Sequence, residues 1–225
     1  MNSVEQKRVF VIIPAYNEET HIKNTIAGAR EYAENITVVD DGSTDKTYAK
    51  AKALTGNIKV LRHKINLGKG AALKTGCETA LKLGADILVM MDADGQHDPD
   101  DIPRLVKELK EKKLDIVFGS RNLDKNAPLY RSLGNKLLTK MVILLSGMPV
   151  CDILSGFRAF KSDAYQKLKW QSSDYSVETE MIINAGKNKL KYEEIAIKTI
   201  YNDNYKGMNI ASGLKIFFNI LKWSL

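Results

Sequence analysis

Two cysteines, Cys77 and Cys151, occur among the 225 residues of the chain. They form neither a disulfide framework nor a paired CxxC metal-ligand pattern, which favours a reducing compartment and a structural role for both. We also expect no secretion signal. Lys7 and Arg8 precede apolar residues, but the run from Val9 to Ile13 is shorter than the apolar region of a signal peptide and stops at Pro14.

Long apolar runs are missing as well. A helix that crosses a bilayer needs about 20 consecutive apolar residues. The nearest candidate is the tail "GLKIFFNILKWSL" (213–225), which lysines interrupt. We therefore expect a chain that does not span a membrane.

Two further absences exclude function classes. No GxGxxG motif follows the first apolar run, which disfavours a dinucleotide oxidoreductase. Aromatic residues make up only 8% of the chain and do not alternate with basic ones, although the formal net charge is +7. Because the basic residues are dispersed along expected helices, we expect no nucleic-acid partner.

Hydrophobic residues make up 44% of the sequence, enough for one compact domain over residues 1–225. Short β-branched runs alternate with segments of helical periodicity in the first half. Strands are expected at 9–13, 36–39, 58–61, 86–91 and 115–119, and helices at 20–32, 44–54, 70–83 and 100–112. This alternation predicts an α/β fold with a parallel sheet covered by helices on both faces.

After Arg121 the alternation lapses. Helices are expected at 130–145, 162–168 and 177–187, a loop at 146–160 and a strand at 192–200. We divide the chain into a regular half at about 8–122, a less regular half at about 123–209 and an amphipathic helix at about 210–225. The last of these has an unusually wide apolar face.

Polar residues follow four of the first five expected strands, as "PAYNEE", "DDGSTD", "DADGQHD" and "GSR". Ligands of open parallel sheets bind outside the carboxyl ends of the strands. These four segments should therefore converge on one edge of the sheet.

The segment "VMMDADGQHDPDD" (89–101) concentrates acid in a basic chain. In an extended segment Asp92 and Asp94 point to the same side, with Cα atoms roughly 7 Å apart, and Gln96 continues that alternation. Hard oxygen ligands favour Mg²⁺ or Mn²⁺ over zinc. Such a cation could join these carboxylates to a diphosphate.

The other three acids of this segment, Asp98, Asp100 and Asp101, have a simpler explanation. Together with Pro99 they begin a helix, where negative charge complements the helix dipole.

Two further polar segments allow both a ligand-binding and a purely structural interpretation. In "DDGSTD" a turn and a helix cap explain Gly42, Ser43 and Thr44, but leave Asp40 and Asp41 unexplained. In "NLGKGAA" the order of Lys69 and Gly70 does not match an NTPase phosphate loop. Its glycines could let a ligand approach the backbone, or the segment could simply start a helix.

In order and spacing, "PAYNEE", "VVDDGSTD", "NLGKGAA", "MDADGQHDP", "GSR" and "DILSGFRAF" resemble the family 2 inverting glycosyltransferases. The resemblance is greatest to the branch that makes polyprenyl-phosphate sugars, the dolichyl-phosphate mannose and glucose synthases. It covers essentially the whole chain and is dense from about Val9 to Phe160. It implies a GT-A fold with a mostly parallel nucleotide-binding sheet in the first half and an irregular acceptor-side portion in the second.

The resemblance also implies a nucleoside diphosphate sugar donor and a divalent cation, Mg²⁺ or Mn²⁺. The implied metal ligands are Asp92, Asp94 and Gln96. The residues implied to bind the nucleotide sugar are Pro14, Tyr16, Glu18, Val39, Asp41, Lys69, Asp92 and Ala93.

On the acceptor side, the resemblance implies a catalytic set of Asp152, Arg121 and Arg158. Asp152 lies where many relatives keep a carboxylate suited to a catalytic base. A hydroxyl acceptor needs such a base, whereas a phosphate monoester, whose second pKa is near 6, is largely ionised at neutral pH. If the acceptor is a lipid phosphate, Asp152 could position other groups instead.

Guanidinium groups bind phosphate bidentately. The candidates for the acceptor phosphate are Arg121, Arg131, Arg158 and Lys206. Lys206 is the only stand-in for a late basic cluster that several relatives carry. Glu178 and Glu180 match an acidic pair of the family, and their role could be structural.

We therefore expect a hexosyltransferase that transfers sugar to dolichyl or polyprenyl phosphate with inversion, at the cytoplasmic face of a membrane. The resemblance favours UDP-glucose over GDP-mannose as donor. An alternative is transfer to a glycan hydroxyl with Asp152 as base. The tail stripe of Leu214, Phe217, Phe218 and Leu221 fits either an interfacial helix or one packed on the protein.

Overall fold

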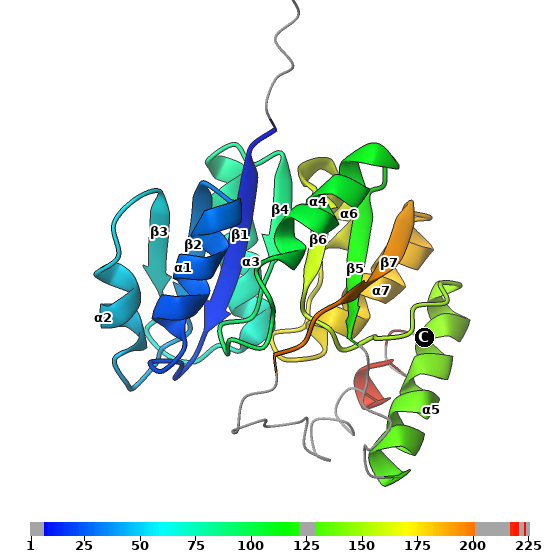
Figure 1. The fold of residues 1–225 in the computed structure, drawn as a ribbon. Coiled ribbons are helices and arrows are strands. Elements are labelled where there is room, and N and C mark those ends of the chain that lie inside the picture. Colours follow the sequence, from blue (N-terminus) through cyan, green and yellow to red (C-terminus); the bar gives the residue numbers. More distant parts are fainter. Residues whose placement is uncertain (1–6, 122–128, 201–216, 221–222, 224–225) are drawn as a thin grey trace, which may run out of the picture.

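The computed structural model describes residues 7–121, 129–200, 217–220 and 223, with the backbone alone for 129–136. Its centre is a seven-stranded sheet in the order β3-β2-β1-β4-β6-β5-β7 (Figure 1). The strands are β1 (Val9–Ala15), β2 (Asn35–Asp40), β3 (Ile58–Arg62), β4 (Ile87–Met90), β5 (Ile116–Arg121), β6 (Arg158–Lys161) and β7 (Tyr192–Ile197).

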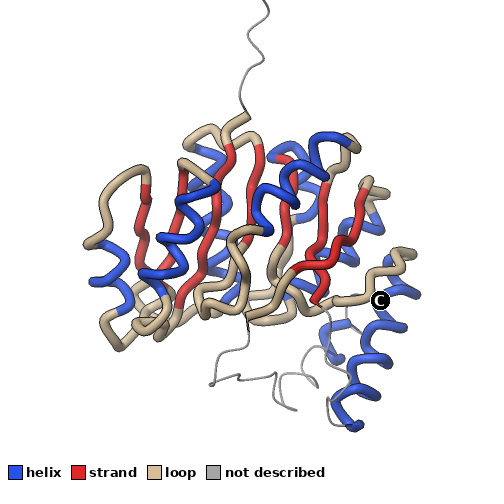
Figure 2. Tube along the Cα trace, in the orientation of Figure 1, coloured by secondary structure: helices blue, strands red, loops and turns tan. Residues whose placement is uncertain are grey.

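The first five strands run parallel to one another, as expected, because helical crossovers connect them. The helices are α1 (Ile22–Tyr32), α2 (Thr47–Lys52), α3 (Lys69–Lys82), α4 (Asp101–Glu111), α5 (Leu129–Ser146), α6 (Tyr165–Leu168) and α7 (Val177–Lys187), with a 3₁₀ turn η1 (Ser162–Ala164) before α6. Figure 2 shows them as layers on the two sides of the sheet.

The second half of the chain corrects two expectations. The end of the expected loop at 146–160 is strand β6, which runs antiparallel between β4 and β5. The expected helix at 162–168 is a 3₁₀ turn followed by one short helix. Since β7 also pairs with β5, the less regular half completes the same sheet as the first half.

Alternate residues of the central strands serve two separate cores. Phe10 and Ile12 of β1 pack with α3, α5, α6 and α7 on one face. Val11 and Ile13 pack with α1, α2 and α4 on the other. The period of two along a strand produces this division, and the sheet is buried on both faces.

Part of the tail also belongs to the core. Ile220 is fully buried in the cluster formed with α5 and α7, and Phe217 and Trp223 pack against it. Asn219 donates a hydrogen bond to Ser176 Oγ at 2.8 Å, whereas Phe218 is 65% exposed. One face of this segment is therefore packed on the protein. Within the residues described, no helix combines the length and apolarity needed to cross a membrane.

Candidate functional site

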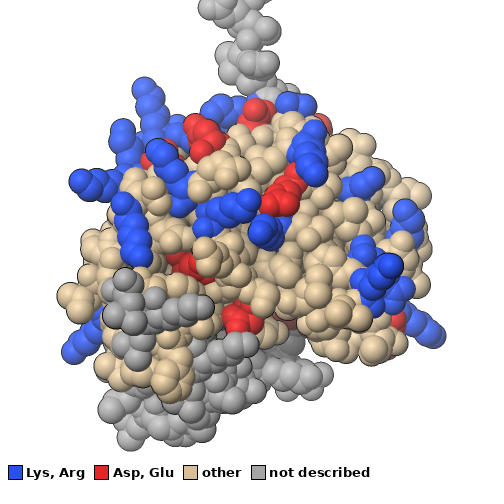
Figure 3. All heavy atoms as spheres, turned by 180° about the vertical axis from the view of Figure 1, so that it is seen from behind, with Lys and Arg blue, Asp and Glu red and all other residues tan. Residues whose placement is uncertain are grey.

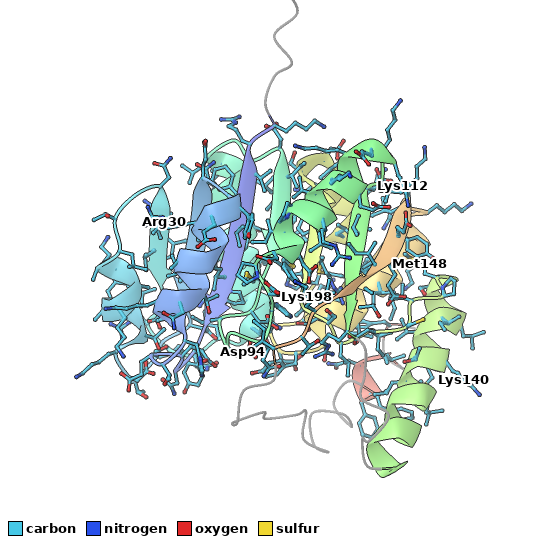
Figure 4. The ribbon with its side chains drawn as sticks, viewed as in Figure 1. Arg30, Asp94, Lys112, Lys140, Met148 and Lys198 are labelled. Atoms are coloured by element: carbon cyan, nitrogen blue, oxygen red, sulfur yellow. The ribbon has the colours of Figure 1, made fainter. Side chains whose placement is uncertain are left out.

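The polar strand ends lie along one edge of the sheet, as the sequence predicts. Strands β1, β2, β4 and β5 all point their carboxyl ends toward this edge. Figure 4 labels Asp94 at this edge and Lys112 at the opposite one. Viewed from behind, Lys and Arg side chains gather toward the amino ends of the strands, away from this edge (Figure 3).

The loops after β1 and β2 are joined by hydrogen bonds. The Asn17 N–H donates to Ser43 Oγ at 2.9 Å, and Asn17 Oδ1 accepts the Thr44 N–H at 2.9 Å. The Glu18 N–H donates to Thr47 Oγ1 at 2.8 Å. "PAYNEE" and "DGSTD" therefore form one rigid unit at the site edge.

The expected nucleotide residues of these loops differ in accessibility. Pro14 and Val39 are buried register partners of β1 and β2. Tyr16, just beyond β1, is 44% exposed. Ala93 is buried, and its carbonyl accepts a hydrogen bond from Thr25 Oγ1 at 3.1 Å. Tyr16 is thus the member of this set that offers an open side chain to a ligand.

Asp41 is buried and holds the start of α3. Its carboxylate accepts the N–H groups of Leu67 at 3.0 Å and Gly68 at 2.7 Å. His63 Nδ1 lies 2.7 Å from Asp41 Oδ1. A turn alone would not require Asp41. Its carboxylate instead fixes the "NLGKG" loop.

The glycines of "NLGKGAA" accommodate a protein segment. A Cβ on Gly68 or Gly70 would overlap the carbonyl oxygens of Ser173 and Ser172. Trp170 Nε1 donates to the Gly70 carbonyl at 2.8 Å. Close approach of the 172–173 backbone explains these two glycines, and the expectation that they admit a ligand has no support in this packing.

Lys69 lies between two carboxylates. Its Nζ is 2.7 Å from Asp92 Oδ1 and 2.6 Å from Glu178 Oε1. Burial alone would lower the pKa of Lys69, but the charges of Asp92 and Glu178 outweigh it and raise the pKa above its ordinary value. Gly156 closes over the pair, because a Cβ there would lie 2.8 Å from Asp92 Oδ2 and 2.9 Å from Lys69 Nζ.

Asp92 and Asp94 lie in different electrostatic environments. Burial opposes ionisation of Asp92, yet the positive charge of Lys69 holds its pKa below the ordinary value. Burial and the charge of Asp92 raise the pKa of Asp94. The Gln96 N–H donates to Asp94 Oδ1 at 3.0 Å, which brings the third expected ligand beside it.

His97 also belongs to this segment, and no sequence motif singled it out. Its ring stacks on Phe157 with centroids 4.7 Å apart, and Nδ1 accepts the Asp92 N–H at 3.1 Å. Because Nδ1 accepts this N–H it carries no proton, so the ring is neutral with its proton on Nε2. Burial also lowers the pKa of His97. His97 therefore fixes the backbone at Asp92.

The charge balance around Asp92 suits a divalent cation. Among the side chains that the structure describes, five carboxylates interact there with three cationic groups, an excess of two negative charges. The carboxylates are Asp92, Asp94, Asp152, Glu178 and Glu194, and the cations are Lys69, Arg121 and Arg158.

The ligand set of such a cation is incomplete without other groups. Among the described residues no group of three His, Cys, Asp or Glu side chains could by itself hold a metal ion. Gln96 and oxygen atoms from a bound diphosphate would have to supply the remaining ligands. The residues present fit Mg²⁺ or Mn²⁺ on that condition.

Arg121 and Asp152 form a bidentate pair at the end of β5. Arg121 Nε lies 2.8 Å from Asp152 Oδ2, and its second nitrogen donates to Oδ1 at 3.0 Å. The Arg121 N–H donates to Oδ2 at 3.1 Å. Asp152 is 3% exposed, so both oxygens of the expected base already accept hydrogen bonds inside the protein.

The structure does not bring Arg158 to the surface of the site. The side chain is 1% exposed, and its guanidinium donates to the carbonyls of Ser155 at 3.0 Å and Glu178 at 2.6 Å. It also lies over the Phe118 ring, 5.1 Å from the centroid. This placement argues against contact with an acceptor phosphate and favours a role in holding the 153–155 segment to α7.

Three other expected residues remain to be placed. Arg131 lies on α5, in the part where only the backbone is described, and Lys206 lies outside the described residues. Glu180 accepts the N–H groups of Gln171 and Ser172 at 2.8 and 2.9 Å, which supports the structural interpretation of that residue.

Comparison with known proteins places these observations in a family. The model described as "Glycosyl transferase family 2" matches residues 10–169. The UDP-N-acetylglucosamine–dolichyl-phosphate N-acetylglucosaminyltransferase of Methanococcus voltae is 40% identical, covering 96% of this chain and 95% of that protein.

Two other relatives are more distant. The polyprenol monophosphomannose synthase of Mycolicibacterium smegmatis is 30% identical, covering 97% of this chain and 88% of that protein. The dolichyl-phosphate beta-glucosyltransferase ALG5D of Trichomonas vaginalis is 30% identical, covering 96% of this chain and 73% of that protein.

Among solved structures, glucosyl-3-phosphoglycerate synthase from Mycobacterium tuberculosis, in complex with Mn²⁺, UDP and phosphoglyceric acid, matches with a TM-score of 0.76. It is 19% identical, and the match covers 97% of this chain and 79% of that one. The likeness shows the fold, which is the expected GT-A fold.

Proposed function

The chain belongs to glycosyl transferase family 2, and from this membership we propose that it transfers a hexose from a nucleoside diphosphate sugar to dolichyl or polyprenyl phosphate with inversion. The observation that carries the proposal is the position of Asp92 and Asp94 at the carboxyl end of β4, with Lys69 paired to Asp92. Three relatives named for transfer to such lipid phosphates support the acceptor class.

The donor is proposed to be a uridine diphosphate sugar. The sequence favours UDP-glucose, and the name of the 40% identical relative makes UDP-N-acetylglucosamine its main competitor. GDP-mannose is the alternative, because another relative is named for mannose transfer. Tyr16 and the joined loops after β1 and β2 would hold the nucleotide.

A divalent cation would be held by Asp92, Asp94 and Gln96. When bound, it would stabilise negative charge on the diphosphate leaving group. Lys69 would stay with Glu178 and keep Asp92 ionised. Arg121, held by Asp152, would face the phosphate groups of donor or acceptor.

A lipid phosphate removes the need for a protein base. Its attacking oxygen is largely ionised at neutral pH. Both oxygens of Asp152 are engaged by Arg121, which suits a positioning role better than proton abstraction. An acceptor with a free hydroxyl would need a base, so the geometry favours the phosphate.

The acceptor chemistry also suggests where the protein works. A polyprenyl phosphate stays in a bilayer, so the site must meet the membrane surface. We propose peripheral association at the cytoplasmic face. Exposed apolar side chains on α5 and the tail, Leu144 at 84% and Phe218 at 65%, are suited to such a surface.

Transfer into an extractable lipid tests the proposal. The full chain would be incubated with Mn²⁺, polyprenyl phosphate and radiolabelled UDP-glucose, UDP-N-acetylglucosamine or GDP-mannose in separate reactions. We expect label in the solvent phase with one uridine donor, and its loss in Asp94→Asn or with a chelator. Asp100→Asn, at an exposed position beyond the site, is the matched control and should retain transfer.

Failure with all three donors would overturn the acceptor assignment. Label in a soluble glycan instead, together with near-complete loss of turnover in Asp152→Asn, would establish the hydroxyl-acceptor alternative with Asp152 as base.

A further inference from the structure

Glu194, on the edge strand β7, binds the backbone beside Asp152. Its Oε1 and Oε2 accept the Cys151 N–H at 3.0 and 2.9 Å, and Oε1 accepts the Asp152 N–H at 2.9 Å. Cys151 and Asp152 lie between α5 and β6, in a stretch without helix or strand. The carboxylate of β7 therefore fixes the backbone of this irregular segment directly at Asp152.

Asp152 in turn fixes the position of the Arg121 guanidinium. Three donors of Arg121, its N–H, Nε and one terminal nitrogen, bind the two oxygens of Asp152. The Leu154 N–H also donates to Oδ1 at 3.3 Å. A shift of the 151–152 backbone would move the acceptor pair that aims the guanidinium, since bidentate pairing depends on a fixed geometry.

Packing alone would not require a charged side chain at position 194. Glu194 and Asp152 are both acidic, so their proximity is unfavourable without nearby positive charge. The electrostatic surroundings of Arg158 include both carboxylates, and Arg121 pairs with Asp152. Bonds from N–H groups to a charged acceptor are roughly twice as strong as neutral ones, which suits an anchor that must hold a reactive group in place.

The neighbouring residue provides a contrast. Glu193 alternates to the other face of β7, where its carboxylate lies 2.6 Å from Nζ of Lys112, a residue at the opposite edge of the sheet from Asp94. Two adjacent glutamates on one strand thus differ in partner. Glu193 forms a surface ion pair, and Glu194 binds the backbone N–H groups of Cys151 and Asp152.

We propose that Glu194 is a positioning residue that acts through Asp152 to aim Arg121 at the acceptor phosphate. The inference rests on the proposed function, because it assumes that the acceptor is a phosphate. The acceptor-side geometry of the site then depends on a residue of the edge strand, 73 residues after Arg121 in the sequence.

Steady-state kinetics of the full chain with farnesyl phosphate as a water-soluble acceptor tests the proposal. Glu194→Ala should raise the acceptor KM by about tenfold, equivalent to a loss of one moderate interaction, and leave the donor KM unchanged. Glu194→Gln should recover most of the affinity, because one amide oxygen can still accept both N–H groups. Glu193→Ala, the matched control, should keep both KM values.

A double-mutant cycle separates this role from a general loss of stability. If Glu194 acts through Arg121, then Glu194→Ala should add little to the acceptor KM of Arg121→Lys. Equal increases in donor and acceptor KM, independent effects of the two substitutions, or a Glu193→Ala variant as impaired as Glu194→Ala would each overturn the proposal. Failure of the proposed function would be distinct, since the unaltered chain would then not glycosylate farnesyl phosphate at all.

Discussion

Asp92 and Asp94 are two residues apart, yet their surroundings shift the pKa values of the two carboxyl groups in opposite directions. Burial opposes ionisation of Asp92, but the charge of Lys69 outweighs it and holds the pKa below the ordinary value. Burial and the charge of Asp92 act together on Asp94 and raise its pKa. Asp94 is therefore the group whose ionisation costs the metal-free protein stability and whose charge a bound cation would neutralise.

This difference predicts opposite effects of Asp94→Asn on stability and metal affinity. A raised pKa in the folded state means that ionised Asp94 destabilises the fold above that pKa, and that the cost vanishes as the pH falls toward the ordinary value near 4. Asp94→Asn should therefore stabilise the metal-free protein at neutral pH and lose that advantage on acidification. Urea denaturation from pH 4 to pH 8 measures this difference.

Metal affinity should change in the other direction. Loss of the carboxylate should weaken Mn²⁺ binding, measured calorimetrically with UDP present, by more than about tenfold. Asp100→Asn, at an exposed position later in the same segment, serves as control for both measurements. A variant that is less stable than the parent at neutral pH would contradict the raised pKa of Asp94.

The sequence was sufficient to separate the two acidic sets of this segment. Asp101 is the first residue of α4, and its buried carboxylate accepts the Lys198 N–H at 2.7 Å. Pro99 indicates the helix start, but the expected extended chain through Asp92 and Asp94 is wrong, because β4 ends at Met90 and residues 93–94 form a turn. Nothing local in the sequence indicates that Glu178 or Glu194 reaches the site, because their partners lie in other elements far along the chain.

At the scale of elements, the parallel strands were predictable and β6 was not. Strands β1 to β5 are apolar runs between helices, which is the pattern that a crossover imposes. Strand β6 has four residues and begins with Arg158, whose charge argues against a buried position. The carbonyls of Ser155 and Glu178 and the Phe118 ring accommodate that charge, and only the folded chain assembles them.

The contact between α3 and the 172–173 segment predicts whether Gly70→Ala stabilises or destabilises the protein. Helix propensity alone favours alanine by about 1 kcal/mol. A Cβ at this position would instead overlap the Ser172 carbonyl, so the substitution should destabilise the protein by about 1 to 3 kcal/mol. Urea denaturation gives the sign directly, with Lys82→Ala at the exposed end of α3 as control. A stabilised Gly70→Ala variant would contradict the close approach of the two segments.

At the scale of the whole molecule, apolar cores cover both faces of the sheet. The face with α1, α2 and α4 and the face with α3, α5, α6 and α7 are both apolar. Charged residues therefore concentrate at the strand ends and on the outer surfaces, and the rear view shows many Lys and Arg side chains toward the amino ends of the strands (Figure 3). The net positive charge of the sequence thus does not describe the site, where the side chains that the structure describes carry an excess of negative charge.

The described tail residues include one buried and one exposed apolar side chain. Substitutions there test both expected roles of this segment, packing on the protein and contact with a membrane. Ile220 is fully buried whereas Phe218, two residues earlier, is 65% exposed. Ile220→Ala should destabilise the protein by about 2 to 4 kcal/mol, because a buried cavity replaces the side chain. Phe218→Ser should change stability by less than about 0.5 kcal/mol, as surface substitutions usually do.

The same two variants should differ in the opposite sense at a lipid surface. Sedimentation with anionic phospholipid vesicles should show weaker binding of Phe218→Ser, because an exposed aromatic side chain that inserts into the interface contributes to the binding free energy. Ile220→Ala, measured at a temperature where it is folded, should bind like the parent chain. Unchanged vesicle binding of Phe218→Ser would assign this helix to protein packing alone and leave membrane contact to other surfaces such as α5.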